Sequence, residues 1–200
     1  MLRVEKLNQF YGQSHILWDL EFNIKEGSCA CLMGRNGVGK TTFLNIAGLL
    51  EGFTHGDYFL DGINVSNLSD NKSATIRNEK IGFIFQGFNL IPDLNLAENI
   101  EVPLRYRGFN AKERQRRVQE ALEQVGLASR LKHLPTQLSG GQQQRVAIAR
   151  ALAGEPRFLL AGEPTGNLDS LMARQVMELL ENITQAGTTI IMVTHDPELA

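Results

Sequence analysis

A glycine-rich segment between an apolar stretch and a helix-like stretch constrains the fold of this chain more than any other feature. The segment, GRNGVGKTT at residues 34–42, fits the pattern G-x-x-x-x-G-K-[ST] at Gly34, Gly39, Lys40 and Thr41. Glycines let the backbone curl so that successive N–H groups point inward at phosphate oxygens. We therefore predict a strand, a phosphate-binding loop and a helix in direct succession, as in α/β proteins that bind nucleotides.

The side chains of this loop have separate expected roles. Lys40 should reach the β- and γ-phosphates, and the Thr41 hydroxyl should coordinate Mg²⁺. The N-terminus of the following helix should add partial positive charge. The other residues of the loop that we expect at the nucleotide are Arg35, Asn36, Gly37, Val38 and Thr42. By itself the motif leaves kinases, GTPases and motor ATPases open.

The rest of the chain reads as one domain, since 200 residues that are 42% hydrophobic can bury a core. The last third alternates strand-like and helix-like segments, which predicts a parallel sheet covered by helices. A mostly helical stretch at about 90–135 carries Val118, Leu122 and Val125 on one face and charges on the other. We predict strands at 1–7, 18–24, 28–34, 56–62, 81–86, 157–162 and 188–195, and helices at 141–154 and 170–187.

Charge and hydropathy exclude some classes of function. The formal net charge is −2 and the basic residues are scattered, so we expect no nucleic-acid partner. The apolar runs are far shorter than the roughly 20 residues that cross a bilayer, so we expect a cytoplasmic chain without direct membrane insertion. Cys29 and Cys31 should point to the same face of a strand, as two buried, reduced thiols.

A second string, LSGGQ at residues 138–142, narrows the family. Ser139, Gly140 and Gly141 at the start of a helix would offer a hydroxyl and free N–H groups to a phosphate, although a Gly-Gly pair could also be a simple turn. Together with the phosphate loop, this string resembles the signature of the ATP-binding subunits of ABC transporters. The resemblance covers nearly all 200 residues, with several motifs in the same order.

The resemblance implies a P-loop NTPase fold of the ABC ATPase type. Its α/β core, with a mostly parallel sheet and an N-terminal antiparallel β subdomain, would comprise residues 1–86 and 136–200, and a helical subdomain residues 87–135. It also implies a homodimer, or a dimer with a similar ATPase subunit, that encloses two Mg-ATP. Each ATP would lie between one chain's phosphate loop and the LSGGQ of the other. Transmembrane permease subunits would hold the dimer at the inner face of the cell membrane.

Single residues take roles from the same resemblance. Tyr11 would stack on adenine, an ordinary core or surface tyrosine being the alternative. Gln86 would meet Mg²⁺ and the attacking water, and His195 would touch the γ-phosphate. Glu163, directly after an apolar strand, would be the general base, with a buried salt bridge as the alternative. The residues expected at the partner chain and its nucleotide are Ser139, Gly140, Gly141, Gln142 and Asp169.

The chain departs from the family pattern at Gly162, where family members carry an Asp that holds Mg²⁺. Loss of such an outer ligand typically costs about 10- to 100-fold in metal affinity or activity. We expect an active ATPase of reduced rate, with an ATP-binding regulatory or scaffold module of weak or no hydrolysis as the alternative. A soluble ABC protein of translation or DNA repair is a third class, although such proteins usually carry tandem cassettes.

Two further features concern the subgroup and the C-terminal end. From about Phe53 onward the sequence is most similar to the lipoprotein-releasing and macrolide-efflux group, whereas the N-terminal part is more similar to ATPases of urea and branched-chain amino-acid importers. The sequence stops at THDPELA, earlier than family members usually do. This predicts a short or trimmed C-terminal end.

Overall fold

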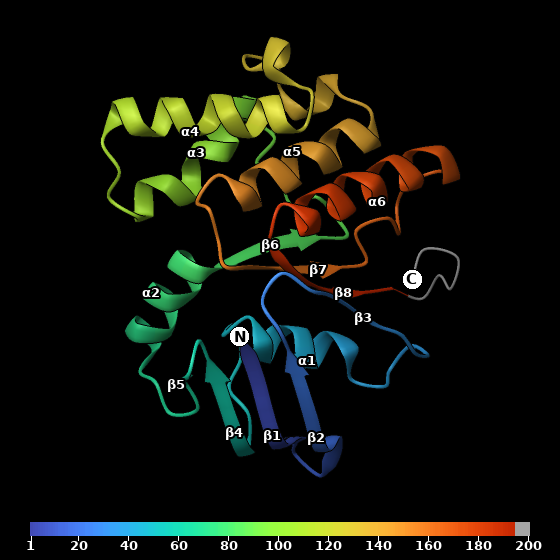
Figure 1. The fold of residues 1–200 in the computed structure, drawn as a ribbon. Coiled ribbons are helices and arrows are strands. Elements are labelled where there is room, and N and C mark those ends of the chain that lie inside the picture. Colours follow the sequence, from blue (N-terminus) through green and yellow to red (C-terminus); the bar gives the residue numbers. More distant parts are fainter. Residues whose placement is uncertain (195–200) are drawn as a thin grey trace.

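The computed structural model describes residues 1–194, which form two four-stranded sheets with helices between and outside them (Figure 1). The first sheet is antiparallel and has the order β2-β1-β4-β5. Along β1, buried and exposed residues largely alternate, as in a sheet with one face on the core and one in water. Its strands are β1 (Leu2–Tyr11), β2 (Ser14–Ile24), β4 (His55–Leu60) and β5 (Ile63–Asn64).

The second sheet is parallel and has the order β3-β8-β7-β6. Every residue of β8 is buried, and so are the first four of β7, because helices or the other sheet cover both faces. Both sheets confirm the expected α/β class with an N-terminal antiparallel part. The strands are β3 (Cys29–Leu32), β6 (Ile81–Phe85), β7 (Phe158–Gly162) and β8 (Thr189–Val193).

Six α-helices lie within the described residues 1–194, and most of them begin at a residue that satisfies the first backbone N–H groups. Asn95, Asn110, Ser139 and Asp169 each accept a hydrogen bond in this way. Two short 3₁₀ turns, Ala128–Arg130 and Pro135–Gln137, precede α5. The helices are α1 (Lys40–Ala47), α2 (Asp70–Lys80), α3 (Leu96–Tyr106), α4 (Ala111–Gln124), α5 (Gly140–Leu152) and α6 (Ser170–Gln185).

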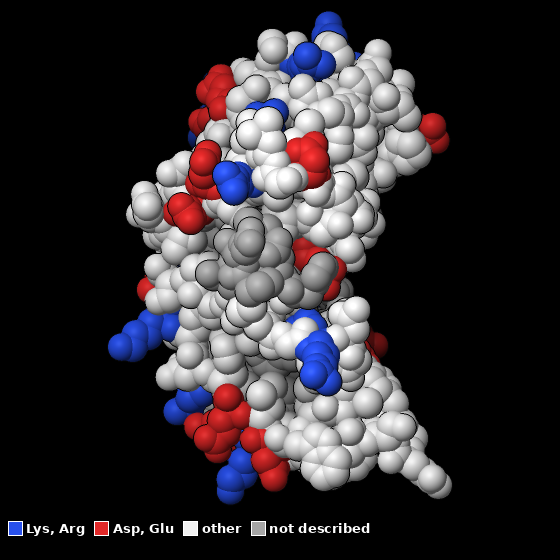
Figure 2. Space-filling view, turned by 90° about the vertical axis from the view of Figure 1, so that its right-hand side faces the viewer, with Lys and Arg blue, Asp and Glu red and all other residues white. Residues whose placement is uncertain are grey.

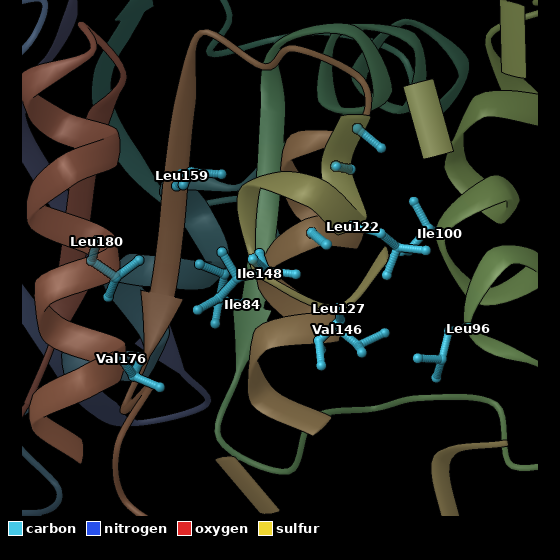
Figure 3. Close-up of a cluster of buried hydrophobic side chains, with 14 of the residues drawn as sticks. Ile84, Leu96, Ile100, Leu122, Leu127, Val146, Ile148, Leu159, Val176 and Leu180 are labelled. Carbon is cyan, nitrogen blue, oxygen red and sulfur yellow. The ribbon is translucent and has the colours of Figure 1, made fainter. Parts of the chain in front are cut away.

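The parallel sheet separates two hydrophobic clusters. On one side, α1 lies between the two sheets and packs with strand residues such as Phe158 and Ile191 (Figure 1). On the other side, helices α3 to α6 pack over residues such as Ile84 and Leu159 (Figure 3). Val118, Leu122 and Val125 are all buried in this second cluster, which confirms the predicted face. One core therefore joins the helical region to the sheet.

The expectation of two buried thiols was wrong. Cys29 is exposed and Cys31 is half-buried, because β3 has only β8 as a neighbour among the described strands. Ala30 and Leu32 pack in the cluster around α1, whereas Cys31 packs in the opposite cluster, so the expected alternation of faces holds. Burial raises the pKa of both thiols.

Two surface properties bear on partners. Within residues 1–194 no helix is both long and apolar enough to cross a bilayer. Figure 2 shows basic and acidic side chains interspersed over one face of the molecule, without a continuous area of one sign.

Candidate nucleotide-binding site

The phosphate loop, residues 34–42, connects β3 to α1 as predicted. Gly37 and Gly39 have φ values of 84° and 92°, in the left-handed region that glycine adopts most easily. A Cβ on Gly39 would lie 2.8 Å from the Leu17 side chain of β2, so this position also needs glycine for close packing. The antiparallel sheet therefore packs against the loop at Gly39, and helix α1 begins at the next residue.

The loop borders a pocket of about 230 Å³. Lys40 lies at the start of α1, and its Nζ donates hydrogen bonds to the carbonyl oxygens of Gly34 (2.5 Å) and Arg35 (2.9 Å). The amine is thereby positioned at the loop's own backbone. The pocket is lined by Tyr11, Ile16, Asn36, Gly37, Gly39, Lys40, Thr41, Thr42 and Glu163. Gly34, Arg35 and Val38 belong to the same loop and are exposed.

Tyr11 lies at the end of β1 and reaches this pocket from the antiparallel sheet. Its side chain is 45% exposed, which excludes a core tyrosine. The hydroxyl donates a hydrogen bond to the Glu51 carboxylate, just beyond α1. That bond and, to a lesser degree, burial raise the pKa of Tyr11, against an opposing hydrogen bond with Thr42. The ring is therefore fixed beside the phosphate loop, and Glu51 is a residue that the sequence analysis missed.

Glu163 follows β7 and is half-buried in the wall of the same pocket. Its backbone N–H donates to the Val193 carbonyl of β8 (2.9 Å), and its φ of 50° lies in the left-handed region. A non-glycine residue in that conformation costs about 1–3 kcal/mol, and such residues persist where the surroundings impose them. The parallel sheet therefore presents this carboxylate at its carboxyl edge, where ligands collect in α/β folds.

Gly162 occupies the last position of β7. Its backbone is not in the left-handed region, and the atom nearest to an added Cβ would be a side-chain carbon of Leu44 in α1, at 3.4 Å. The backbone and the space would therefore accept a larger residue.

Gln86 follows β6 and is exposed, and it does not line the pocket. Its side chain lies against Gly166, where a Cβ would come within 2.7 Å of the Gln86 Nε2. Its carbonyl accepts a hydrogen bond from Asn167 Nδ2 (2.9 Å). The structure thus brings Gln86 to the segment that follows Glu163.

The LSGGQ segment begins α5. Ser139 Oγ accepts from the Gln142 N–H (3.4 Å), and Gln142 Oε1 accepts from the Ser139 N–H (3.1 Å), which forms a capping box. Gly141 packs so closely on Met172 of α6 that a Cβ would lie 2.8 Å from its sulfur. Asp169 caps α6 through the Met172 N–H (2.9 Å). Ser139, Gly140, Gly141, Gln142 and Asp169 do not line the pocket of their own chain.

The remaining predictions for the site concern His195 and Mg²⁺. His195 lies outside the described residues. Among residues 1–194 no group of three or more His, Cys, Asp or Glu side chains is arranged to hold a metal ion. Side-chain oxygen atoms that line the pocket include the hydroxyls of Thr41 and Thr42, the amide oxygen of Asn36 and the carboxylate of Glu163.

Comparison with known protein families and sequences gives one consistent result. The sequence model of the family described as ABC transporter matches residues 17–166. The chain is 48% identical over 185 residues to YknY of Bacillus subtilis (strain 168), described as an uncharacterized ABC transporter ATP-binding protein, and the match covers 92% of this chain and 80% of YknY. It is 40% identical over 204 residues to the macrolide export ATP-binding/permease protein MacB of Neisseria meningitidis serogroup B, covering 100% of this chain and 32% of MacB.

Solved structures give the same result for the fold. A dimeric structure of a post-hydrolysis state of the ATP-binding cassette MJ0796, bound to ADP and Pi, matches with a TM-score of 0.89 and 42% sequence identity. The match covers 100% of this chain and 90% of that chain. The similarity to MacB also agrees with the expected likeness to the macrolide-efflux group.

Proposed function

The chain belongs to the ABC transporter family, and on that premise we propose that it is the ATP-binding and ATP-hydrolysing subunit of an ABC transporter. The observation that carries this proposal is the composition of one pocket. Lys40 and Thr41 of the phosphate loop, Tyr11 of the antiparallel sheet and Glu163 of the parallel sheet all line it. A cation can bind phosphate, an aromatic ring can stack on a base and a carboxylate can act as general base, so these groups together suit binding and hydrolysis of ATP.

Binding of ATP would use both the backbone and the side chains of the pocket. The N–H groups of the phosphate loop and the N-terminus of α1 would surround the phosphates, with Lys40 adding a full positive charge. The Tyr11 ring, fixed by Glu51, would stack on the adenine. We also propose that the nucleotide contacts the other residues of the loop, Gly34, Arg35, Asn36, Val38 and Thr42.

Hydrolysis would use Glu163 as general base toward the attacking water, and His195 toward the γ-phosphate. The pocket fits Mg²⁺, because that ion prefers oxygen ligands and commonly binds through few protein groups plus substrate phosphates. Thr41 would hold it through its hydroxyl. Gln86 does not line the pocket as the structure places it, so its amide oxygen would reach the ion only after a movement of the side chain. When bound, the ion would neutralise charge on the phosphates.

A second chain would complete the site. Ser139 to Gln142 and Asp169 lie away from the pocket of their own chain, and this separation supports a role at the pocket of another chain. The solved structure of the related cassette is described as dimeric. We propose a dimer of two copies, or of one copy with a similar ATPase subunit, in which LSGGQ meets the partner's ATP. In each copy, residues 1–86 and 136–200 would form the nucleotide-binding core and residues 87–135 the helical subdomain.

A permease would be the membrane partner, which would place the chain at the inner face of the cell membrane. A groove of about 950 Å³ between α2, β6 and α3 supports this proposal. Tyr106 (81% exposed) and Phe85 (36% exposed) line it and offer apolar surface to a partner. Asn89 lines it as well, so an occupant of the groove would lie beside the segment that follows Gln86.

The test compares ATP hydrolysis by the chain with that of its Glu163→Gln variant. General bases contribute about 100- to 10,000-fold, so turnover should fall by that range while ATP binding remains. The variant should also elute as an ATP-bound dimer in gel filtration, because the dimer opens only after hydrolysis. Glu178→Gln, an exposed carboxylate on α6, is the matched control and should keep the parent rate. A parent rate in Glu163→Gln would refute the role of the base.

A further inference from the structure

The segment that follows β6, residues 86–89 (the Gln86 loop), has an unusual backbone. Phe88 and Asn89 have φ values of 60° and 50°, and neither is glycine. Left-handed conformations are unfavourable for residues with a Cβ, most of all for bulky ones. Such conformations persist where contacts from the surroundings impose them. The contacts that do so here come from two other parts of the chain.

The first contact comes from α5. The Arg150 guanidinium donates hydrogen bonds to the carbonyl oxygens of Asn89 (Nη1, 2.5 Å) and Phe88 (Nη2, 2.9 Å). Burial of the guanidinium lowers the pKa of Arg150. One planar side chain thus bonds both left-handed residues, in a fork that lysine cannot reproduce.

The second contact comes from the segment 163–169 (the Glu163 loop). Asn167 Nδ2 donates to the Gln86 carbonyl (2.9 Å), and Gly166 packs directly on the Gln86 side chain. The Gly166 N–H in turn donates to the Glu163 carbonyl (3.1 Å). The Gln86 loop therefore lies between α5 and the Glu163 loop, with two hydrogen bonds from Arg150 on one side and one from Asn167 on the other.

We propose that Arg150 and Asn167 are positioning residues that fix the Gln86 loop relative to Glu163. The inference rests on the proposed function, because Gln86 and Glu163 take their roles from it. Neither positioning residue lines the nucleotide pocket, so each acts through the loop. Any displacement of α5 would carry the two carbonyls, and with them Gln86, toward or away from the Glu163 loop.

The experiment uses the full chain and the variants Arg150→Met, Arg150→Lys and Asn167→Ala, with Arg145→Met as the matched control. Arg145 lies on the same helix and also donates to a backbone carbonyl, that of Val125 (3.4 Å), but it bonds another segment. Two readouts are taken: amide hydrogen exchange of segment 85–90, and kcat, KM for ATP and the Mg²⁺ requirement. Exchange does not depend on turnover, so it decides the positioning role even if the chain does not hydrolyse ATP.

We expect exchange of segment 85–90 to rise about tenfold or more in Arg150→Met and Asn167→Ala, because a charge-assisted or backbone-directed bond is lost. The value of kcat should fall about tenfold and the Mg²⁺ requirement should rise, with KM for ATP unchanged. Arg150→Lys should restore part of both effects. In a double variant that combines Arg150→Met with Asn167→Ala, the two effects should be less than additive, since both residues hold one loop.

Three results would overturn the inference. The first is exchange of segment 85–90 in Arg150→Met at the parent rate. The second is a rise in that exchange no larger than in Arg145→Met. The third, in an active parent, is a rise in exchange with kcat and the Mg²⁺ requirement unchanged. By contrast, a parent without ATPase activity would refute the proposed function and leave the exchange result to decide the positioning role.

Discussion

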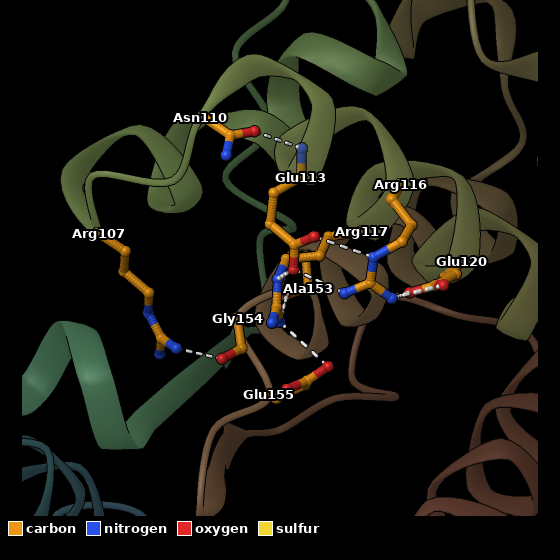
Figure 4. A network of polar contacts seen from close by, with 9 residues as sticks. All are labelled: Arg107, Asn110, Glu113, Arg116, Arg117, Glu120, Ala153, Gly154 and Glu155. Carbon is orange, nitrogen blue, oxygen red and sulfur yellow. Dashed lines mark hydrogen bonds and ion pairs between the residues drawn. The ribbon is translucent and has the colours of Figure 1, made fainter.

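The helical region α3–α4 and the nucleotide pocket are built in opposite ways. In the helical region, an asparagine cap begins each helix. Glu113 pairs with Arg116 (2.6 Å) and Arg117 (2.7 Å) within α4 (Figure 4), and Glu101 of α3 pairs with Arg114 of α4 (2.5 Å). Around the pocket, by contrast, the phosphate loop is exposed, and Glu163 has a left-handed backbone.

The difference teaches where stability and function reside. Capping, ion pairs and a buried face agree with one another in the helical region, and such agreement favours one stable structure. Pocket residues are instead held in conformations that serve ligand binding, at a local cost. We therefore expect changes in the pocket to alter activity more than stability, and changes in the helical region to do the reverse.

The largest expected effect comes from Lys40→Ala. Lys40 would make charge-assisted hydrogen bonds to phosphate, and each such bond contributes roughly 1.5–3 kcal/mol. Its loss should therefore weaken ATP binding by about 100-fold. The unfolding midpoint should fall by only a few degrees, because the partners of the amine are carbonyl oxygens of an exposed loop. Calorimetric titration with ATP and thermal unfolding measure both. Lys112→Ala, an exposed lysine of α4, is the control, and equal binding by both variants would contradict the prediction.

Leu122→Ala is the corresponding change in the helical region. Leu122 is fully buried in the cluster of Figure 3, so truncation should lower the free energy of unfolding by about 2–5 kcal/mol. KM for ATP should stay at the parent value below the unfolding transition. Urea unfolding measures the loss, with Leu171→Ala, a leucine that is 69% exposed, as the control. A raised KM without a loss of stability would break the comparison.

Gly162→Asp tests the pocket through a change that should increase ATPase activity. The backbone at 162 is ordinary β-strand, and the nearest atom to an added Cβ is a side-chain carbon at 3.4 Å, so the variant should fold normally. An added outer-sphere carboxylate should lower the Mg²⁺ requirement or raise turnover by about 10- to 100-fold. A magnesium titration of ATPase activity measures this. An inactive parent that gains activity in the variant would favour the alternative of a regulatory module.

The smallest expected effect concerns Glu113 and pH. Hydrogen bonds from Arg116 and, to a lesser degree, Arg117 hold the pKa of Glu113 at about 2, below its usual value of 4.5, although desolvation of the carboxylate acts in the opposite direction. A lowered folded-state pKa contributes stability that is present above pH 4.5 and lost as the pH falls toward 2. Glu113→Gln should therefore lose stability slightly at neutral pH and depend less on pH between these values. Urea unfolding at several pH values, beside Glu178→Gln, measures the difference.

Local signals in the sequence were sufficient for much of the fold. Hydrophobic runs and periodicity predicted the strands of the parallel sheet and the helices α5 and α6, and the glycine pattern predicted the phosphate loop. Helix α2 was missed, because it buries none of its residues completely and has no apolar face to show in its sequence. The exposure of Cys29 was also missed, because it depends on the edge position of β3.

The sequence by itself was enough to identify the family, and it predicted the phosphate loop, the proposed base Glu163 after β7 and the signature at the start of α5. Only the tertiary structure decided which of these residues share a pocket and what holds them there. Tyr11 meets Glu51 across 40 residues, Arg150 meets Asn89 across 61, and Asn167 meets Gln86 across 81. Propensity and periodicity act over a few residues, whereas such contacts depend on the order of strands in the sheet and the packing of helices upon it.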